Sequence, residues 1–179
     1  KWARTAVVRG GHAGCLERRR LPHKLQPGVC EFDGRLSLAA ANGFLYLYAR
    51  ANLRQKNGGR YVQVARRDLA GGPWAPFAPL DIEGYRWQDA FDGNIYFAAV
   101  NRNPVDDTTL LGLMPHTKGC CSAFVSLALS CDGARFSPLE PVLTSTLAPY
   151  GRSTDHPVDG FLATDEEVYV YVHRNVPGI

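Results

Sequence analysis

An acidic residue followed by glycine recurs three times along this chain, each time where a strand-like segment is expected to begin. The three copies are Asp33-Gly34, Glu83-Gly84 and Asp159-Gly160. Each is followed by an apolar residue and a tyrosine, at Leu45-Tyr46, Ile95-Tyr96 and Val168-Tyr169. The acid and the tyrosine stand 13 residues apart in the first two copies and 10 apart in the third. A repeat of about 50 residues with two strands per copy predicts sheets arranged around a common axis.

The first copy has the clearest strand pattern. Residues 35–40 and 44–51 are joined by Asn42-Gly43, a strong hairpin signal because both residues tolerate positive φ. Residues 61–66 form a third strand, and residues 74–80 contain prolines that suit only an edge strand. These segments predict a four-stranded antiparallel meander, the unit from which a propeller blade is built.

The second and third copies are expected to repeat that plan. In the second, 85–91 is the predicted innermost strand, 94–101 the second strand, 123–130 the third main strand and 136–139 the outer strand. Residues 110–114 form a short apolar piece between them. The third copy is expected to start at Asp159-Gly160, turn at Asp165-Glu166 and stop after His173.

The predicted fold is therefore all-β with little helix, because no 3.6-residue periodicity persists for ten residues. Residues 1–30 form an irregular N-terminal arm, and 31–179 form a partial β-propeller, five-bladed when complete. Its blades cover about 31–81, 82–143 and 153–179, the last one incomplete. Three units cannot close a ring, so further blades or a partner chain are expected to complete it. The first residue, Lys1, fits a processed or truncated chain.

Composition excludes several classes of function. Apolar residues make up 45% and charged residues 21%, as in ordinary soluble domains, and no apolar run approaches the ~18 residues of a membrane span. The net charge of +3 gives no general argument for nucleic acid as a partner. No phosphate-binding or dinucleotide fingerprint occurs. We predict no metal and no cofactor.

The five cysteines leave the cellular compartment open. Their number is odd and none forms a C-x-x-C pair. Disulfides such as Cys15–Cys30 or Cys120–Cys131 require an oxidising compartment, and the sequence does not choose between pairings. Zinc ligation by His116 with the adjacent Cys120 and Cys121 matches no common spacing.

The three repeated acids are the candidate catalytic residues. In a propeller, the starts of the innermost strands converge at one end of the axis, so Asp33, Glu83 and Asp159 would face one funnel. Glycoside hydrolysis needs two carboxyl groups roughly 5–9.5 Å apart, and a third can tune their pKa values. The alternative is structural, because acid-glycine pairs are common in turns.

Four further residues are candidates for substrate binding. Asp155 and His156 stand just before Asp159, so they could line the same funnel, although His156 could equally pack before the rigid Pro157. Arg86 and Trp87 could stack on a sugar ring or pack between blades. The polar residues that end the second strands, Arg50 and Asn101 among them, are expected at the opposite rim.

Several motifs resemble one enzyme group. Strands of the 45–50 type, and the link from 65–69 to 74–77, resemble the five-bladed β-propeller glycoside hydrolases of the arabinanase, levansucrase and invertase group. Residues 130–136 are similar to the Ser-x-Asp-Gly-x-x-Trp/Phe turn of those enzymes. The resemblance covers about residues 31–175 as short motifs.

The resemblance implies a function for the repeated acids. It gives Asp33, Glu83 and Asp159 the roles of nucleophile or base, pKa modulator and general acid. The third position departs from the family, whose general acid is usually Glu. The sequence thus favours a carbohydrate-binding or glycoside-hydrolysing propeller, and the alternative is an inactive scaffold or recognition module in a larger assembly.

Overall fold

The computed structural model describes residues 35–53, 59–86, 94–118, 122–145 and 153–177. Throughout these ranges the chain is built from β-strands and turns, without a helix, which confirms the predicted all-β class. Accordingly, no helix in these ranges has the length and apolar character needed to cross a membrane. The predicted irregular arm, residues 1–30, lies outside the described residues.

The first sheet confirms the predicted four-stranded antiparallel meander. It contains β1 (Ser37–Ala41), β2 (Phe44–Leu53), β3 (Gly59–Asp68) and β4 (Ala78–Pro79), in the order β1-β2-β3-β4. Asn42 and Gly43 have φ of 50° and 79° and form the hairpin turn between β1 and β2, as the sequence predicts. Pro79 lies on the edge strand, where its missing N–H costs nothing.

The second sheet is also four-stranded and antiparallel. It contains β6 (Ala99–Arg102), β7 (Leu110–Lys118), β8 (Ser122–Ser130) and β10 (Glu140–Ser145), in the order β10-β8-β7-β6. The predicted third main strand is therefore present as β8. The short apolar piece predicted at 110–114 is a full strand, β7, which pairs with β8 along nine residues.

One expectation about the second sheet is wrong. The outer strand is β10 rather than 136–139, because Phe136 leaves the sheet to bury its ring edge-on against Tyr48, with the centroids 6.1 Å apart. Its segment, β9 (Arg135–Phe136), pairs in parallel with β5 (Asp81–Ile82). The predicted second strand, 94–101, is present in part: β6 includes its last three residues, and Ile95 forms an isolated antiparallel bridge with His116 of β7. The predicted inner strand 85–91 lies mostly outside the described residues.

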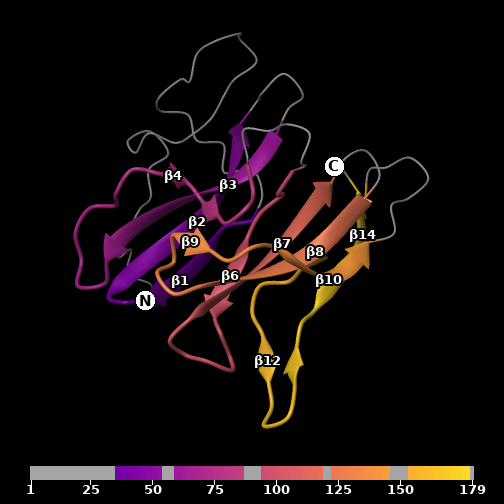
Figure 1. Cartoon of the computed structure of the whole chain (residues 1–179). Coiled ribbons are helices and arrows are strands. Elements are labelled where there is room, and N and C mark those ends of the chain that lie inside the picture. Colours follow the sequence, from indigo (N-terminus) through magenta and orange to yellow (C-terminus); the bar gives the residue numbers. More distant parts are fainter. Residues whose placement is uncertain (1–34, 54–58, 87–93, 119–121, 146–152, 178–179) are drawn as a thin grey trace, which may run out of the picture.

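The third unit consists of two small antiparallel sheets. β11 (Ser153–Pro157) pairs with β14 (Val172–Pro177), so the sheet starts before Asp159 and continues past His173. β12 (Leu162–Ala163) and β13 (Val168–Tyr169) form a hairpin that extends away from the sheets (Figure 1). The predicted turn at its tip is confirmed, since the Thr164 N–H donates to the Glu167 carbonyl at 2.8 Å.

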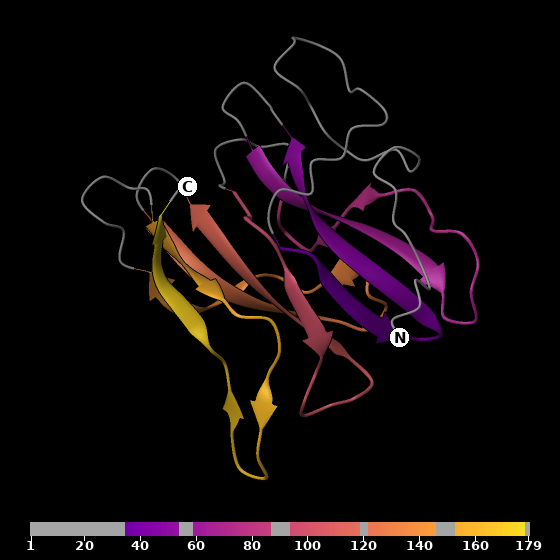
Figure 2. The same cartoon turned by 180° about the vertical axis from the view of Figure 1, so that it is seen from behind.

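The second sheet has a hydrophobic core on each face, because side chains alternate along β7. Leu110 and Met114 pack with the tyrosines and valines of the first sheet. Leu111 and Leu113 pack in a second cluster with Phe97 and residues that include Phe161 of the third unit. The three units therefore lie in sequence across space, with the second sheet between the other two, and this arrangement can be followed from both sides (Figures 1 and 2).

Among the polar contacts that join the first sheet to the second are those of two side-chain hydroxyls of the first sheet. The Ser37 hydroxyl donates to the Val100 carbonyl and accepts from the Val100 N–H, both at 2.9 Å, so it replaces a strand partner at the edge of β6. The turn after β8 provides the other contact, because the Tyr48 hydroxyl donates to the Gly133 carbonyl at 2.7 Å. Inside that turn, Asp132 Oδ1 accepts the N–H groups of Ala134 and Arg135. This Ser-x-Asp-Gly segment thus has a structural role.

Candidate functional site

The predicted catalytic acids differ in their settings. Asp33 lies outside the described residues. Glu83 is exposed at the first central position of a tight turn, in which the Tyr85 N–H donates to the Ile82 carbonyl at 3.0 Å and Gly84 has φ of 74°. The Glu83 N–H donates to the Phe136 carbonyl, and this bond holds the turn against β9. This geometry is the structural role that acid-glycine pairs commonly have.

Asp159 connects the second and third units. It is exposed, and its Oδ1 accepts a hydrogen bond from Asn101 Nδ2 at 2.9 Å. The expectation that Asn101 lies at the rim opposite to Asp159 is therefore wrong. The cause is the position of β6 at the sheet edge, which brings its end beside the chain that leaves β11. Among the described residues, no hydrogen bond or ion pair connects Asp159 with Glu83.

Asp155 is buried and holds an irregular pairing of two strands. It occupies a register shift in β11, opposite Asn175, whose φ of 54° is unusual for a residue other than glycine. Its Oδ1 accepts the Asn175 N–H at 2.9 Å, and its Oδ2 lies 3.1 Å from Nε of Arg174. Its own N–H donates to the Ser145 hydroxyl. Asp155 therefore fixes the position of the residue that follows it, His156.

The His156 ring lies in an aromatic environment. It stacks on Tyr96 with the centroids 4.9 Å apart and meets Phe97 edge-on at 5.4 Å. Its Nε2 lies 2.9 Å from the Thr154 hydroxyl oxygen. The side chain is only 7% exposed, so the packing role considered for it from sequence is part of what it does.

Three arginines of the first unit lie close to the rings of Tyr96 and Phe97. The guanidinium carbons of Arg50 and Arg60 lie 5.0 and 5.1 Å from the Tyr96 centroid, within cation–π range. Arg35 lies 5.4 Å from the Phe97 centroid and donates from Nη1 to the Pro157 carbonyl. We call the following residues the junction cluster: Arg35, Arg50, Arg60, Tyr96, Phe97 and His156.

The backbone explains why side chains from three units meet here. The residues that precede β6 are tied to the start of β3 by two hydrogen bonds. The Arg60 N–H donates to Asn94 Oδ1 at 2.7 Å, and the Ile95 N–H donates to the Arg60 carbonyl. The Tyr96 N–H donates to the carbonyl of Pro115 in β7. Tyr96 is thus held between the first two sheets. β11 packs against β7 and β8 and brings His156 to the same place.

The electrostatics of the cluster favour a neutral imidazole. Burial, followed by the positive charge of Arg35, lowers the pKa of His156 from 6.5 to about 4, and the Asp155 carboxylate opposes this effect only in part. His173 also lowers this pKa. At neutral pH the ring is therefore uncharged, and its nitrogens offer one donor and one acceptor. Arg35 and Arg60 are half-buried, whereas Arg50 is buried.

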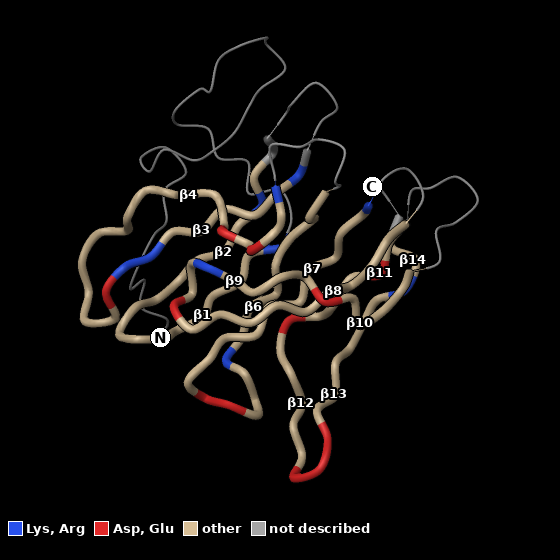
Figure 3. The backbone as a smooth tube through the Cα atoms, viewed as in Figure 1, with Lys and Arg blue, Asp and Glu red and all other residues tan. Residues whose placement is uncertain are grey.

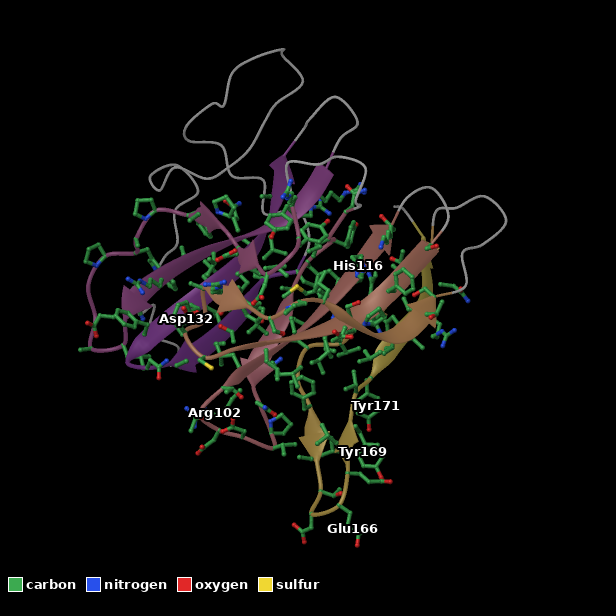
Figure 4. The ribbon with its side chains drawn as sticks, in the orientation of Figure 1. Arg102, His116, Asp132, Glu166, Tyr169 and Tyr171 are labelled. Carbon is green, nitrogen blue, oxygen red and sulfur yellow. The ribbon has the colours of Figure 1, made fainter. Side chains whose placement is uncertain are left out.

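Of the other predicted binding residues, Arg86 is exposed and Trp87 lies outside the described residues. The described ranges contain no group of three or more His, Cys, Asp or Glu side chains that could hold a metal. His116, on β7, is buried beside Phe124, and burial lowers its pKa (Figure 4). Cys131 is a free, exposed thiol, and the other four cysteines are outside the described residues.

Sequence reasoning found His156 but missed most of its neighbours. Arg50 was expected at the far rim, and Tyr96 was considered only as a repeated strand residue. Neither Arg35 nor Arg60 belongs to a motif. The contacts join residues separated by about 35 to 120 positions, and no short-range pattern predicts them. No protein-family model, no curated protein and no solved structure matches the chain.

Proposed function

We propose that the three units are consecutive blades of a β-propeller and that the junction cluster binds a carbohydrate where these blades converge. The observation that carries the proposal is the meeting of side chains from all three units around Tyr96, Phe97 and His156. Binding sites form preferentially where several elements converge and supply a few fixed polar groups among apolar ones.

The chemistry of the cluster suits a ligand rich in hydroxyl groups. A guanidinium carries five N–H donors in a fixed fork, and a neutral imidazole adds a donor and an acceptor. Contact with the Tyr96 and Phe97 rings holds the guanidinium carbons of Arg60 and Arg35 in place. Preorganised donors reduce the entropy lost when a flexible saccharide is bound.

Hydrolysis is the extension of this proposal. It assigns the reaction to Asp33, Glu83 and Asp159, as the resemblance to propeller glycoside hydrolases implies. Asp159 is the described acid in a polar setting, because Asn101 donates to its carboxylate. A binding site that does not hydrolyse the glycan would show the same affinity after Asp159→Asn, with no release of reducing ends by either protein.

The experiment for binding is calorimetry against a panel of oligosaccharides. Tyr96→Ala removes the ring that carries two arginines and the imidazole, and we expect at least a tenfold loss of affinity. Tyr171→Ala is the matched control, because this tyrosine is 59% exposed and is not a member of the junction cluster (Figure 4). Arg60→Gln tests the same site with less effect on packing. Equal affinities of the Tyr96 and Tyr171 variants would contradict the proposal.

A second candidate function, a recognition module in a larger assembly, is favoured by the β12–β13 hairpin. Leu162, Tyr169 and Tyr171 are 53%, 45% and 59% exposed, an unusual concentration of apolar surface on one arm. The arm ends in acidic residues, among them Glu166 at the tip (Figures 3 and 4). Loss of a binding partner in Leu162→Ser, with glycan binding unchanged, would support this function.

A further inference from the structure

The half-buried arginines of the junction cluster retain donors for a ligand. Among the described residues, Arg35 donates one N–H to the Pro157 carbonyl, and its guanidinium carbon lies 5.4 Å from the Phe97 centroid. Arg60 stacks on Tyr96, and its hydrogen bonds at this junction are made by backbone atoms. A stacked guanidinium keeps its N–H groups in the plane of the group, where they can still meet a planar or tetrahedral anion.

Asp155, the acidic residue whose charge acts on His156, already has polar partners of its own. Asp155 accepts the Asn175 N–H and lies 3.1 Å from the Arg174 guanidinium. The other charges that act on His156 come from Arg35 and His173. Besides burial, Arg35 and His173 lower the pKa of His156 and Asp155 raises it, so an anionic ligand would add to the effect of Asp155.

We infer that the carbohydrate bound by the junction cluster is acidic, and that Arg35 and Arg60 hold its carboxylate or sulfate group. This inference rests on the proposed function and narrows its ligand class. A guanidinium and an anionic oxygen form charge-assisted hydrogen bonds, which are roughly twice as strong as those to a sugar hydroxyl. Carboxylate and sulfate groups both accept such hydrogen bonds. The cluster is therefore expected to bind an oligosaccharide that carries either group more tightly than a neutral one.

The test compares three oligosaccharides of equal length by calorimetry: a neutral galactose oligomer, a galacturonic acid oligomer and a sulfated galactose oligomer. We expect the wild-type protein to bind the two acidic oligomers about tenfold or more tightly than the neutral one. Arg60→Gln and Arg35→Gln should each remove most of this preference, because each lowers the affinity for the two acidic oligomers more than the affinity for the neutral one.

Arg66→Gln is the matched control. Arg66 also stacks on an aromatic ring of the first sheet, with its guanidinium carbon 4.7 Å from the Phe44 centroid, but it is exposed and outside the cluster. Its substitution should leave all three affinities unchanged. An equal loss in this variant would mean that surface charge alone attracts the ligand, and the inference would be overturned.

A second measurement follows the protonation of His156. A bound anion favours the imidazolium, so the pKa of His156, read by NMR, should rise when the galacturonic acid oligomer is added and not when the neutral oligomer is added. Arg35, Asp155 and His173 are present in both titrations, so the ligand charge is the difference between them.

The outcomes separate this inference from the proposed function. Neutral and acidic oligomers bound equally well would overturn the acidic ligand and leave carbohydrate binding standing. No binding of any oligosaccharide would overturn both. A single-stranded oligonucleotide of equal charge that binds as tightly as the acidic oligomers would also overturn the inference, because recognition would then require charge without the sugar.

Discussion

The buried imidazole of His156 makes the stability of the protein depend on pH. Burial and the charge of Arg35 lower the pKa of this residue from 6.5 to about 4 in the folded protein. The unfolded chain has the ordinary value, so between the two values the unfolded state binds more protons. The free energy of unfolding therefore rises with pH in this window. This contribution is complete above about pH 6.5 and is lost as the pH falls toward 4.

The size of the effect follows from the two pKa values. A difference of this size corresponds to about 3 kcal/mol once the pH lies below both. Between pH 8 and pH 5, where the folded-state ring is still mostly neutral, the loss is about 2 kcal/mol. Total stabilities of single domains are on the order of 5–15 kcal/mol, so the change is measurable.

The assay is urea unfolding at pH 8, 6.5 and 5 for the wild type and His156→Gln. Glutamine does not titrate and keeps a polar group near Thr154. His116 is also buried with a lowered pKa, but it is present in both proteins, so the difference between their pH profiles belongs to His156. We expect the wild type to lose about 2 kcal/mol more than the variant between pH 8 and pH 5. Parallel profiles, or an NMR-measured pKa of His156 near 6.5 in the folded protein, would refute the reasoning.

Three further predictions concern the contacts between units. Gly133→Ala places a Cβ 2.7 Å from a tyrosine ring at φ of 74°, so denaturation should show a loss of about 3 kcal/mol, against about 1 for Gly43→Ala, which meets open space. Ser37→Ala leaves the buried N–H and carbonyl of Val100 without the hydroxyl, and calorimetric unfolding should show a loss of about 2 kcal/mol. Tyr171→Ser should change stability by less than about 0.5 kcal/mol while reducing the fluorescence of a hydrophobic dye, because the side chain is 59% exposed.

Local chemistry explains which parts of the fold could be predicted from the sequence. Asn42-Gly43 adopts the positive φ values that its hairpin requires, and Pro79 lies on an edge strand. Both depend on neighbouring residues only. The route of Phe136 depends instead on a ring in another sheet, and its departure from the second sheet was therefore not predictable from nearby residues. For the same reason, the strand order of the second sheet was only partly predicted.

In the candidate site, too, some residues could be predicted from the local sequence and others depend on the packing of the sheets. Asp155 and His156 are candidates in the sequence because they stand just before Asp159, and in the structure both are buried where β11 packs against the second sheet. Tyr96 and Arg60 meet because the Ile95 N–H, beside the second sheet, donates to the carbonyl of Arg60 in the first sheet. That contact depends on the sheet packing and has no counterpart in the local pattern.

The junction cluster therefore depends on the packing of β7. The even-numbered side chains Leu110 and Met114 hold the first sheet, while Leu111 and Leu113 hold the third unit. Tyr96 is attached to the same strand through the Pro115 carbonyl. A change of packing on either face of β7 must move Tyr96 relative to the arginines or relative to His156. If the junction cluster binds a ligand as proposed, substitutions of Leu110, Leu111, Leu113 or Met114 should weaken that binding as well as the stability of the protein.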